Sequence, residues 1–183
     1  MHWKLSLSDI GEMLFLPPLP VSLRSKAPNT QLVNLSIAAA GVPLALESRE
    51  VDFAIGILQP SGRGLHSQHL FSEYYVAVSS TAWEPKGDHN TRTLTRLQLE
   101  RAFLAVASPT ATSHKSVEQM LQHARLGSRV AVRAKHFGAP PELAMNSDLL
   151  MIVPLVYAQA RGCQRSPPLT LQYKRQAVVC ANR

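Results

Sequence analysis

Cysteines are scarce in this chain, and long apolar runs are absent. The two cysteines, Cys163 and Cys180, stand neither in a C-x-x-C pair nor beside a histidine at ligand spacing. This pattern argues against a zinc site or a disulfide framework and predicts free thiols. No apolar run approaches the roughly 20 residues that a bilayer-spanning helix needs, and the opening MHWK lacks the basic start and apolar core of a secretory signal. We therefore expect a cytoplasmic protein without a membrane segment.

Residue sets that carry catalysis or hold a cofactor are also missing from the sequence. There is no Ser-His-acid set, no pair of carboxylates and no Gly-rich phosphate loop. The histidines His66, His69 and His89 have no partner at metal-ligand spacing. The sequence therefore predicts no enzyme, no metal site and no cofactor.

Acidic residues are outnumbered by basic ones. There are 12 Asp and Glu against 19 Lys and Arg, a formal net charge of +7, which raises the question of nucleic acid binding. The basic residues are scattered, however, and the densest group, within residues 161–183, has no periodic helical face. We interpret them as a solvated basic surface, with a DNA-reading element as the alternative.

Strand and helix patterns alternate along the 183 residues, a length that suits one domain or two small lobes. The composition, 45% hydrophobic and 17% charged, is that of a folded globular protein. We expect strands at residues 3–7, 31–37, 53–58, 74–78, 102–107, 129–134, 149–153 and 169–173. We expect helices at 42–48, 94–99, 113–123 and 139–145, and another that carries Leu16, Leu19 and Leu23 and ends at 27–29.

This alternation predicts an α/β fold with parallel sheets. Residues 53–58 are apolar throughout, which is typical of a strand covered by helices on both faces. The first three strands form one β-α-β-α-β unit, and a second series runs from about residue 74 to residue 153. Two such lobes imply a cleft, because ligands of open α/β sheets bind beyond the carboxyl ends of the strands. The tail, residues 161–183, is too short for a lobe and is expected to cross back to the first one.

The segment that follows the first strand is small and polar. Ser8, Asp9 and Gly11 separate that strand from the next helix, and Pro17 and Pro18 fit only within the first turn of the helix. Such a turn points backbone N–H groups and the positive end of a helix dipole at whatever lies above the sheet, which predicts an anion site. The alternative is an ordinary connection in which Ser8 or Asp9 caps a helix and binds nothing.

Separate segments of the chain, in order, resemble one protein family. They are SDIGE (8–12) with FLPPL (15–19), ALESREVDFAIG (45–56), LFSEYYV (70–76), HFGAP (136–140) and NSDLLMIVP (146–154). Over about residues 5–158 they resemble the effector-binding domain of LysR-type transcriptional regulators. The branch they most resemble answers aromatic acids such as salicylate and benzoate.

The resemblance implies a fold like that of periplasmic type 2 binding proteins, with two Rossmann-like lobes. Residues 1–68 with 158–183 are expected to form lobe I, and residues 69–157 lobe II. The family places a winged helix-turn-helix domain and a linker helix before this region, whereas this chain begins at the first strand, so we expect that part to be absent. The family also continues into a long closing helix. The tail lacks the periodicity for one, which predicts incomplete C-terminal closure.

The same resemblance implies where the effector's carboxylate is held. In the family, the turn that corresponds to Ser8, Asp9, Ile10 and Gly11 binds it through hydroxyl and backbone N–H groups. Ser8 is the favoured contact, and the anion argument from the turn itself points to the same place. Asp9 is expected to cap the helix rather than to face an anion.

Further site residues come from the second lobe and from the third strand. His114, at a helix start, and His136, just after a strand, match positions where the aromatic-acid branch has histidines that hydrogen-bond the effector. A histidine can donate to an oxyanion and lend a charge near its pKa. The alternative for both is a structural or merely exposed histidine. Phe137, Ile57 and Leu58 would supply the apolar wall of the cleft, with plain core packing as the alternative.

The leading hypothesis is a ligand sensor. An aromatic carboxylate binds between the lobes and shifts their orientation in a homodimer or tetramer, which reads DNA only through a DNA-binding domain. The chain itself is then expected to bind effector and to pair, but not to read an operator. The alternatives are a solute-binding receptor of the same fold, and an enzyme that uses His114 and His136 in acid–base chemistry.

Overall fold

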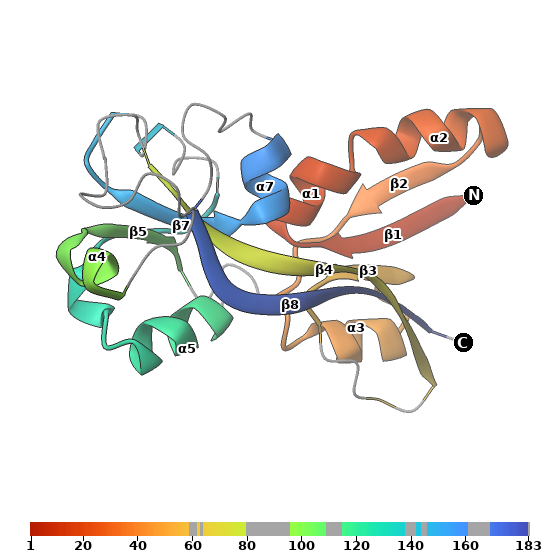
Figure 1. The fold of residues 1–183 in the computed structure, drawn as a ribbon. Coiled ribbons are helices and arrows are strands. Elements are labelled where there is room, and N and C mark those ends of the chain that lie inside the picture. Colours follow the sequence, from red (N-terminus) through yellow and green to blue (C-terminus); the bar gives the residue numbers. More distant parts are fainter. Residues whose placement is uncertain are drawn as a thin grey trace. The chain divides into compact units, whose positions relative to one another are not determined.

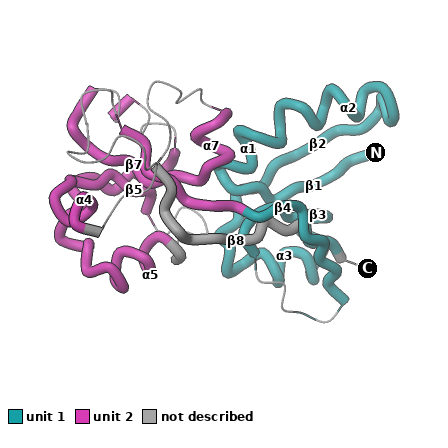
Figure 2. Tube along the Cα trace, viewed as in Figure 1, with its two compact units in different colours: residues 1–72, 176–183 teal, residues 73–175 magenta. Residues whose placement is uncertain are grey.

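The structure is a computed structural model of the chain, and it describes residues 1–58, 62, 64–79, 96–108, 115–137, 142–143, 146–160 and 169–182. The chain forms two compact units, unit 1 from residues 1–72 and 176–183, and unit 2 from residues 73–175 (Figure 2). Two long strands, β4 (Leu65–Val78) and β8 (Leu169–Asn182), have residues in both units. None of the helices in the described ranges is long and apolar enough to cross a membrane.

Unit 1 is the β-α-β-α-β arrangement that the sequence predicts. Its elements are β1 (His2–Leu7), α1 (Asp9–Phe15), α2 (Pro18–Lys26), β2 (Gln31–Asn34), α3 (Val42–Glu47) and β3 (Phe53–Gly56) (Figure 1). The strand order in this unit is β2-β1-β3-β8, with β1 parallel to both β2 and β3, and β3 antiparallel to β8. Because β1 lies between β2 and β3, the two right-handed crossovers place α1 with α2 and α3 on opposite faces of the sheet.

A cluster of buried residues in the described part of unit 1 lies under α3. Its members are Val42, Ala45, Leu46, Val51, Ala54 and Cys180. The buried residues of α3 recur at spacings of three and four, whereas Leu44 on the same helix is exposed, so one face of α3 packs on the sheet. Cys180 is a buried free thiol, as predicted, and Cys163 lies outside the described residues.

Unit 2 has a second parallel arrangement. Its elements are the end of β4, α4 (Arg96–Arg101), β5 (Leu104–Ala107), α5 (Lys115–His123), the short 3-10 helix η1 (Gly127–Arg129), β6 (Val130–Ala134), β7 (Leu150–Pro154) and α7 (Leu155–Ala160). The order is β4-β7-β5-β6, with β5 parallel to β6 and β7, and β4 antiparallel to β7. Every residue of β5 and β7 is buried, as expected for apolar strands inside a covered sheet.

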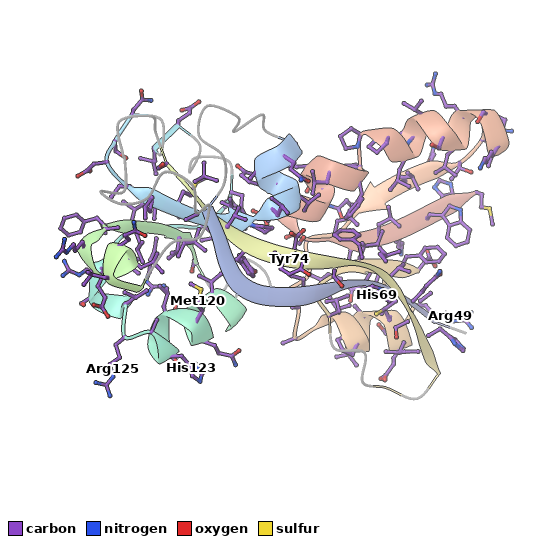
Figure 3. The ribbon with its side chains drawn as sticks, in the orientation of Figure 1. Arg49, His69, Tyr74, Met120, His123 and Arg125 are labelled. Atoms are coloured by element: carbon purple, nitrogen blue, oxygen red, sulfur yellow. The ribbon has the colours of Figure 1, made fainter. Side chains whose placement is uncertain are left out.

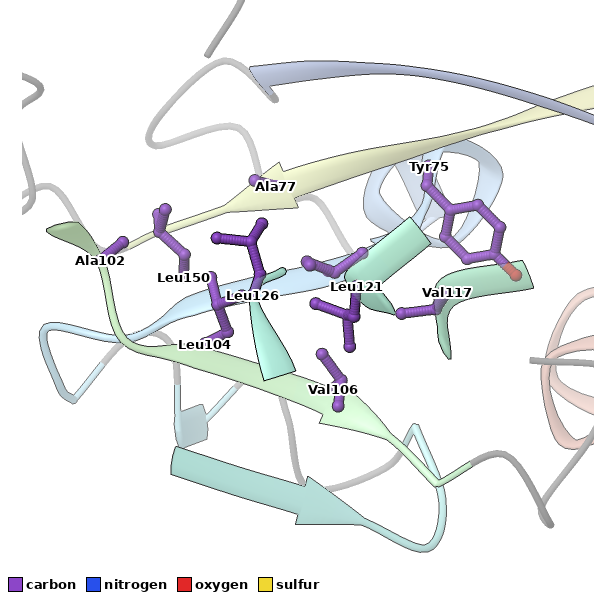
Figure 4. Packing of buried hydrophobic residues seen from close by; sticks show 10 residues of the cluster. Tyr75, Ala77, Ala102, Leu104, Val106, Val117, Leu121, Leu126 and Leu150 are labelled. Atoms are coloured by element: carbon purple, nitrogen blue, oxygen red, sulfur yellow. The ribbon is translucent and has the colours of Figure 1, made fainter. Parts of the chain in front are cut away.

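The core of unit 2 joins α5 to this sheet. Figure 4 shows it, and its members are Tyr75, Ala77, Ala102, Leu104, Val106, Val117, Leu121, Leu126, Leu150 and Ile152. Val117 and Leu121 stand one helical turn apart on α5 and are both buried, which the apolar spacing of that helix predicts.

Two elements differ from the sequence expectation. The polar segment 8–12 is not a turn before a helix at Leu16; it is the cap and first residues of a separate helix, α1, and Pro18 begins the next helix, α2, at its first position. The strand expected at 74–78 begins much earlier, at Leu65. Its first part is mostly exposed, so it shows no apolar alternation by which it could be predicted.

The boundaries of the two units also differ from the expected 1–68 with 158–183 and 69–157. Only residues 176–183 of the tail group with unit 1, and residues up to 175 group with unit 2. Tyr157 and Ala158 are buried in α7, so this helix packs as part of unit 2 rather than ending it. Residues 169–182 form a strand, so the basic tail offers no recognition helix over that range.

Candidate functional site

The predicted anion site is the junction between β1 and α1. Ser8 has an extended backbone (φ −66°, ψ 164°) and is the N-cap of α1. Its Oγ accepts a hydrogen bond from the Gly11 N–H (3.0 Å), and its carbonyl accepts one from the Glu12 N–H (2.7 Å). Ser8 is therefore the helix cap, and the expectation that Asp9 would cap is wrong, because Asp9 is the first helical residue.

Gly11 lets the start of α1 approach the sheet closely. A Cβ atom at this position would lie 3.2 Å from Ser8 Oγ and 3.7 Å from the Ile55 carbonyl oxygen of β3. Gly11 and Ile10 are both buried. A larger residue at position 11 would push against the Ser8 hydroxyl, so the geometry of this corner depends on glycine.

The residues predicted after β3 lie at the same edge of the sheet as Ser8. β1 and β3 are parallel and Leu7 is paired with Ile55, so both strands end at one edge. Ile57 and Leu58 follow β3 there and are half-buried, and Leu58 packs against the core of unit 1. The structure thus brings residues 57–58 and residues 8–11, the cap and first residues of α1, to the carboxyl ends of neighbouring parallel strands, where α/β sheets bind ligands. We call residues 8–11 the Ser8 turn.

Asn34, which the sequence analysis did not single out, links the two sides of the turn. Its Oδ1 accepts a hydrogen bond from the Leu7 N–H (3.0 Å), and its Nδ2 donates one to Glu12 Oε2 (2.9 Å). Asn34 is the last residue of β2. No local pattern marks it, because its partners are at least 22 residues away in the sequence.

The predicted residues of unit 2 differ in exposure. His136 follows β6 and is exposed, whereas Phe137 is only 1% exposed. The Phe137 ring packs on the Tyr157 ring with a centroid distance of 5.4 Å, and the Phe137 carbonyl accepts a hydrogen bond from the Tyr157 hydroxyl. This distance lies within the usual range for aromatic pairs, about 4.5–7 Å. Phe137 is thus a core residue of unit 2, and its role as an apolar wall stays a prediction. His114 lies outside the described residues.

Glu73 is a buried acid that the sequence analysis also missed. Glu73 is only 5% exposed, and its Oε1 accepts hydrogen bonds from the N–H groups of Tyr74 (2.9 Å) and Val156 (3.4 Å). Burial raises the pKa of this carboxyl, and the backbone hydrogen bonds from Tyr74, Val156 and Leu155 act in the opposite direction. Glu73 therefore ties β4 to the start of α7.

Charged side chains away from these contacts lie on the surface of each unit. Figure 3 shows Arg49 after α3 and Arg125 after α5, and both side chains are exposed. Both residues have a positive φ, 58° and 56°, at the position after a helix where glycine is common. Among the side chains that the structure describes, no group of three or more His, Cys, Asp or Glu could hold a metal ion.

The fold and the sequence together match a known family. The family model described as the LysR substrate binding domain matches residues 2–181. The chain belongs to this family. The LysR resemblance of the separate segments is thus confirmed, and the chain is an effector-binding domain of this type.

Curated relatives of this LysR domain are transcriptional regulators. The HTH-type transcriptional activator NagR of a Ralstonia species is 29% identical over 156 residues, which cover 85% of this chain and 50% of NagR. The HTH-type transcriptional activator NahR of Pseudomonas putida is 27% identical over 155 residues, which cover 82% of this chain and 49% of NahR. The chain thus spans about half the length of these relatives, and neither of them is named as an enzyme.

Solved structures share the fold of this LysR domain. The regulatory domain of MexT, a transcriptional activator in Pseudomonas aeruginosa, superposes with a TM-score of 0.70 at 18% identity, covering 100% of this chain and 88% of the MexT chain. The predicted α/β architecture of the periplasmic binding protein type 2 kind is therefore confirmed.

Proposed function

We propose that this LysR substrate-binding domain senses a small aromatic carboxylate. The effector's carboxylate binds at the Ser8 turn, and binding changes transcription through DNA contacts made by a separate DNA-binding region, in the cytoplasm. The observation that carries the proposal is the position of Ser8, which caps a helix at the carboxyl ends of two parallel strands. The aromatic class is supported by the sequence resemblance to the aromatic-acid branch.

The Ser8 hydroxyl can cap the helix and bind an anion at the same time. A hydroxyl has one proton and two lone pairs, and the Gly11 N–H uses a lone pair. The proton remains a donor for a carboxylate oxygen, and the positive end of the α1 dipole adds to the attraction. Asp9 and Glu12 bring negative charge into the same first turn. Binding must therefore depend on directed hydrogen bonds rather than on net charge.

An effector acts as a switch only if it binds one arrangement of the protein better than another. In this proposal His136 is a second contact to the effector, as the sequence resemblance implies, and Ile57 and Leu58 contact its ring. His114 is kept as a further contact of the same kind. Replacement of His136 by alanine should weaken salicylate binding severalfold without lowering the melting temperature, because the side chain is exposed.

The test is calorimetric titration of the chain with salicylate, benzoate and the neutral analogue benzamide. We expect the two acids to bind and benzamide to bind more weakly, since a hydrogen bond to a carboxylate oxygen is stronger than one to a neutral amide oxygen. Ser8→Asp is the decisive variant, because aspartate caps a helix as well as serine does but repels a carboxylate. It should keep the melting temperature and lose at least tenfold in affinity for salicylate.

Ser8→Thr is the matched control for this test, because threonine keeps both the cap and the hydroxyl. It should bind salicylate nearly as the unchanged protein does. Equal salicylate affinity of Ser8→Asp and the unchanged protein would refute the assigned anion site. A failure of both acids to bind would refute the proposed class of effector.

The protein also pairs with itself in this proposal, as a homodimer or tetramer. β2 is the edge strand of the unit 1 order, with Val33 45% exposed, and α2 buries none of its residues, with Val21 74% exposed. An open edge strand beside exposed apolar side chains favours association with another chain. Val21→Lys and Val33→Lys should shift sedimentation toward the monomer. Leu97→Lys, on the exposed face of α4 in unit 2, is the control that should not.

A further inference from the structure

One side chain ties both ends of the Ser8 turn together. Asn34 Oδ1 accepts from the N–H of Leu7, the residue just before the turn, and Asn34 Nδ2 donates to Glu12, the residue just after it. The turn, residues 8–11, is therefore closed by a bridge that begins on a third segment, the end of β2. All of these residues belong to unit 1.

The first hydrogen bond of the bridge takes the place of a backbone hydrogen bond between β1 and β2. β1 and β2 are paired from His2 with Gln31 to Leu5 with Asn34, and the Leu35 N–H still donates to the Leu5 carbonyl (2.8 Å). β1 continues to Leu7 after β2 has ended. Leu7 is buried, so its N–H needs a partner. The Asn34 amide supplies that partner and thereby extends the ladder to the residue before Ser8.

The second hydrogen bond of the bridge fixes the helix. Glu12 stands in the first turn of α1, and its own N–H donates to the Ser8 carbonyl. When Asn34 holds Glu12 Oε2, it holds the first turn of α1 against the end of β2. The direction of the Ser8 hydroxyl depends on that turn, because Oγ is bonded to the Gly11 N–H inside it.

We propose that Asn34 is a positioning residue for the effector's carboxylate, and that it acts by holding Leu7 and Glu12 on the two sides of the Ser8 turn. This inference rests on the proposed function. Asn34 does not touch the effector. It sets the geometry in which the Ser8 hydroxyl meets a carboxylate oxygen. A well-aligned hydrogen bond is stronger to a carboxylate than to a neutral amide of the same shape, so the preference for the acid depends on this alignment.

Two substitutions of Glu12 separate the effect of its hydrogen bond with Asn34 from the effect of its negative charge. Glu12→Gln and Glu12→Ala both remove the negative charge beside the anion site, but only glutamine keeps a side-chain oxygen that can accept from Asn34 Nδ2. The difference between these two variants therefore measures the hydrogen bond alone. Glu12 is exposed, so neither substitution removes a core side chain.

The experiment titrates each variant of the chain with benzoate, salicylate and benzamide. Asn34→Ala should weaken benzoate binding about tenfold and reduce the preference for benzoate over benzamide. Glu12→Gln should bind benzoate about fivefold more tightly than Glu12→Ala. A purely structural role of Asn34 would lower the melting temperature but leave the preference for benzoate over benzamide unchanged. Asn29→Ala, an exposed asparagine in unit 1, is the matched control and should change neither quantity.

The outcomes separate this inference from the proposed function. If the unchanged chain binds benzoate and Ser8→Asp does not, but Asn34→Ala binds as Asn29→Ala does, the positioning role is refuted alone. Equal affinities of Glu12→Gln and Glu12→Ala also refute it, even if Asn34→Ala fails to fold. If the unchanged chain binds neither acid, the proposed function and this inference are both refuted.

Discussion

The two units differ in the contacts that stabilise the interior of each. Among the described residues, one cluster of unit 2 joins ten buried residues, and every residue of its strands β5 and β7 is buried. The described cluster under α3 in unit 1 joins six, and the strands β1, β2 and β3 are only partly buried. The helix α2 in unit 1 buries none of its residues. At the start of α1, polar contacts through Ser8, Asn34 and Glu12 accompany the buried Ile10 and Gly11.

This difference suits two different tasks. A closely packed apolar core resists local change, because a loss of even one methylene is felt. A junction that relies on hydrogen bonds is cheaper to rearrange and can exchange a partner for a ligand. Under the proposed function, recognition therefore belongs to the β1–α1 junction of unit 1, and the apolar core of unit 2 contributes mainly to stability. Substitutions in the two units should separate these properties.

The largest effect is expected from the core of unit 2. Leu121→Ala removes a fully buried side chain from α5 and should lower the free energy of unfolding by about 3 kcal/mol. Leu46→Ala in unit 1 should cost about 2 kcal/mol, because its smaller cluster can collapse further into the void. Urea denaturation followed by circular dichroism measures both. Leu97→Ala, at an exposed leucine, is the control and should cost less than about 0.5 kcal/mol. Equal losses of unfolding free energy at positions 121 and 46 would contradict the proposed difference in packing between the two units.

The buried acid of unit 2 should have the next largest effect. Glu73→Ala leaves the N–H groups of Tyr74 and Val156 without their acceptor and should cost about 2 kcal/mol. Glu73→Gln keeps an accepting oxygen and should cost much less at neutral pH. Thermal unfolding of the two variants tests this order. An equal loss of stability in the glutamine and alanine variants would show that the carboxylate charge, and not the hydrogen bonds from Tyr74 and Val156, stabilises the protein.

The Glu73 carboxyl also predicts the direction of a pH effect. Burial raises its pKa above the ordinary value of 4.5, so the folded protein holds this proton more tightly than the unfolded chain does. The resulting stabilisation is fully present below pH 4.5 and is lost as the pH rises through the raised pKa of the folded state. The unchanged protein should therefore lose stability relative to Glu73→Gln as the pH rises across that window. A constant difference between the two proteins would contradict the raised pKa.

The strands β5 and β7 could be predicted because each is a continuous apolar run. Residues 104–107 and 150–154 are such runs, and the structure buries all of them. α1 was not predicted, although its Ile10, Met13 and Leu14 recur at helical spacings of three and four, because the small and polar residues of SDIGE at its start indicate a turn. The first part of β4 was missed because its side chains are mostly exposed, so pairing with other strands, not local pattern, decides its conformation.

The site could be predicted only where its chemistry is local. The cap at Ser8 was among the predicted alternatives because a helix cap and its first turn lie within four residues of each other, whereas its contact with an effector stays a prediction. Asn34 and Glu73 were missed because their partners are distant in the sequence, with Glu73 and Val156 separated by 83 positions. A buried polar residue of this kind acquires its meaning from the fold. A single sequence does not reveal such contacts.

Gly11→Ala should separate recognition from stability within unit 1. The added methyl lies 3.2 Å from Ser8 Oγ and must displace it, so salicylate affinity should fall about fivefold, or about 1 kcal/mol. Alanine also favours the helix by about 1 kcal/mol over glycine, so the melting temperature should change little. Gly127→Ala in unit 2 meets nothing within 4 Å and is the control for affinity. If Gly11→Ala binds salicylate as tightly as the unchanged protein does, the Ser8 hydroxyl does not contact the effector.

The smallest effect is one in which the two units should behave alike. Arg49 ends α3 in unit 1 and Arg125 ends α5 in unit 2, and both have the positive φ at which a Cβ atom is strained. Glycine relieves that strain but also frees the unfolded chain, so Arg49→Gly and Arg125→Gly should each stabilise by about 0.5 kcal/mol. Arg24→Gly, inside α2, is the control and should destabilise by a similar amount, because its helical backbone gains nothing from glycine. Differential scanning calorimetry resolves the three variants. A gain at position 125 with a loss at position 49 would mean that the packing of each unit, rather than the local backbone, decides the outcome, and would extend the contrast between the units to their helix ends.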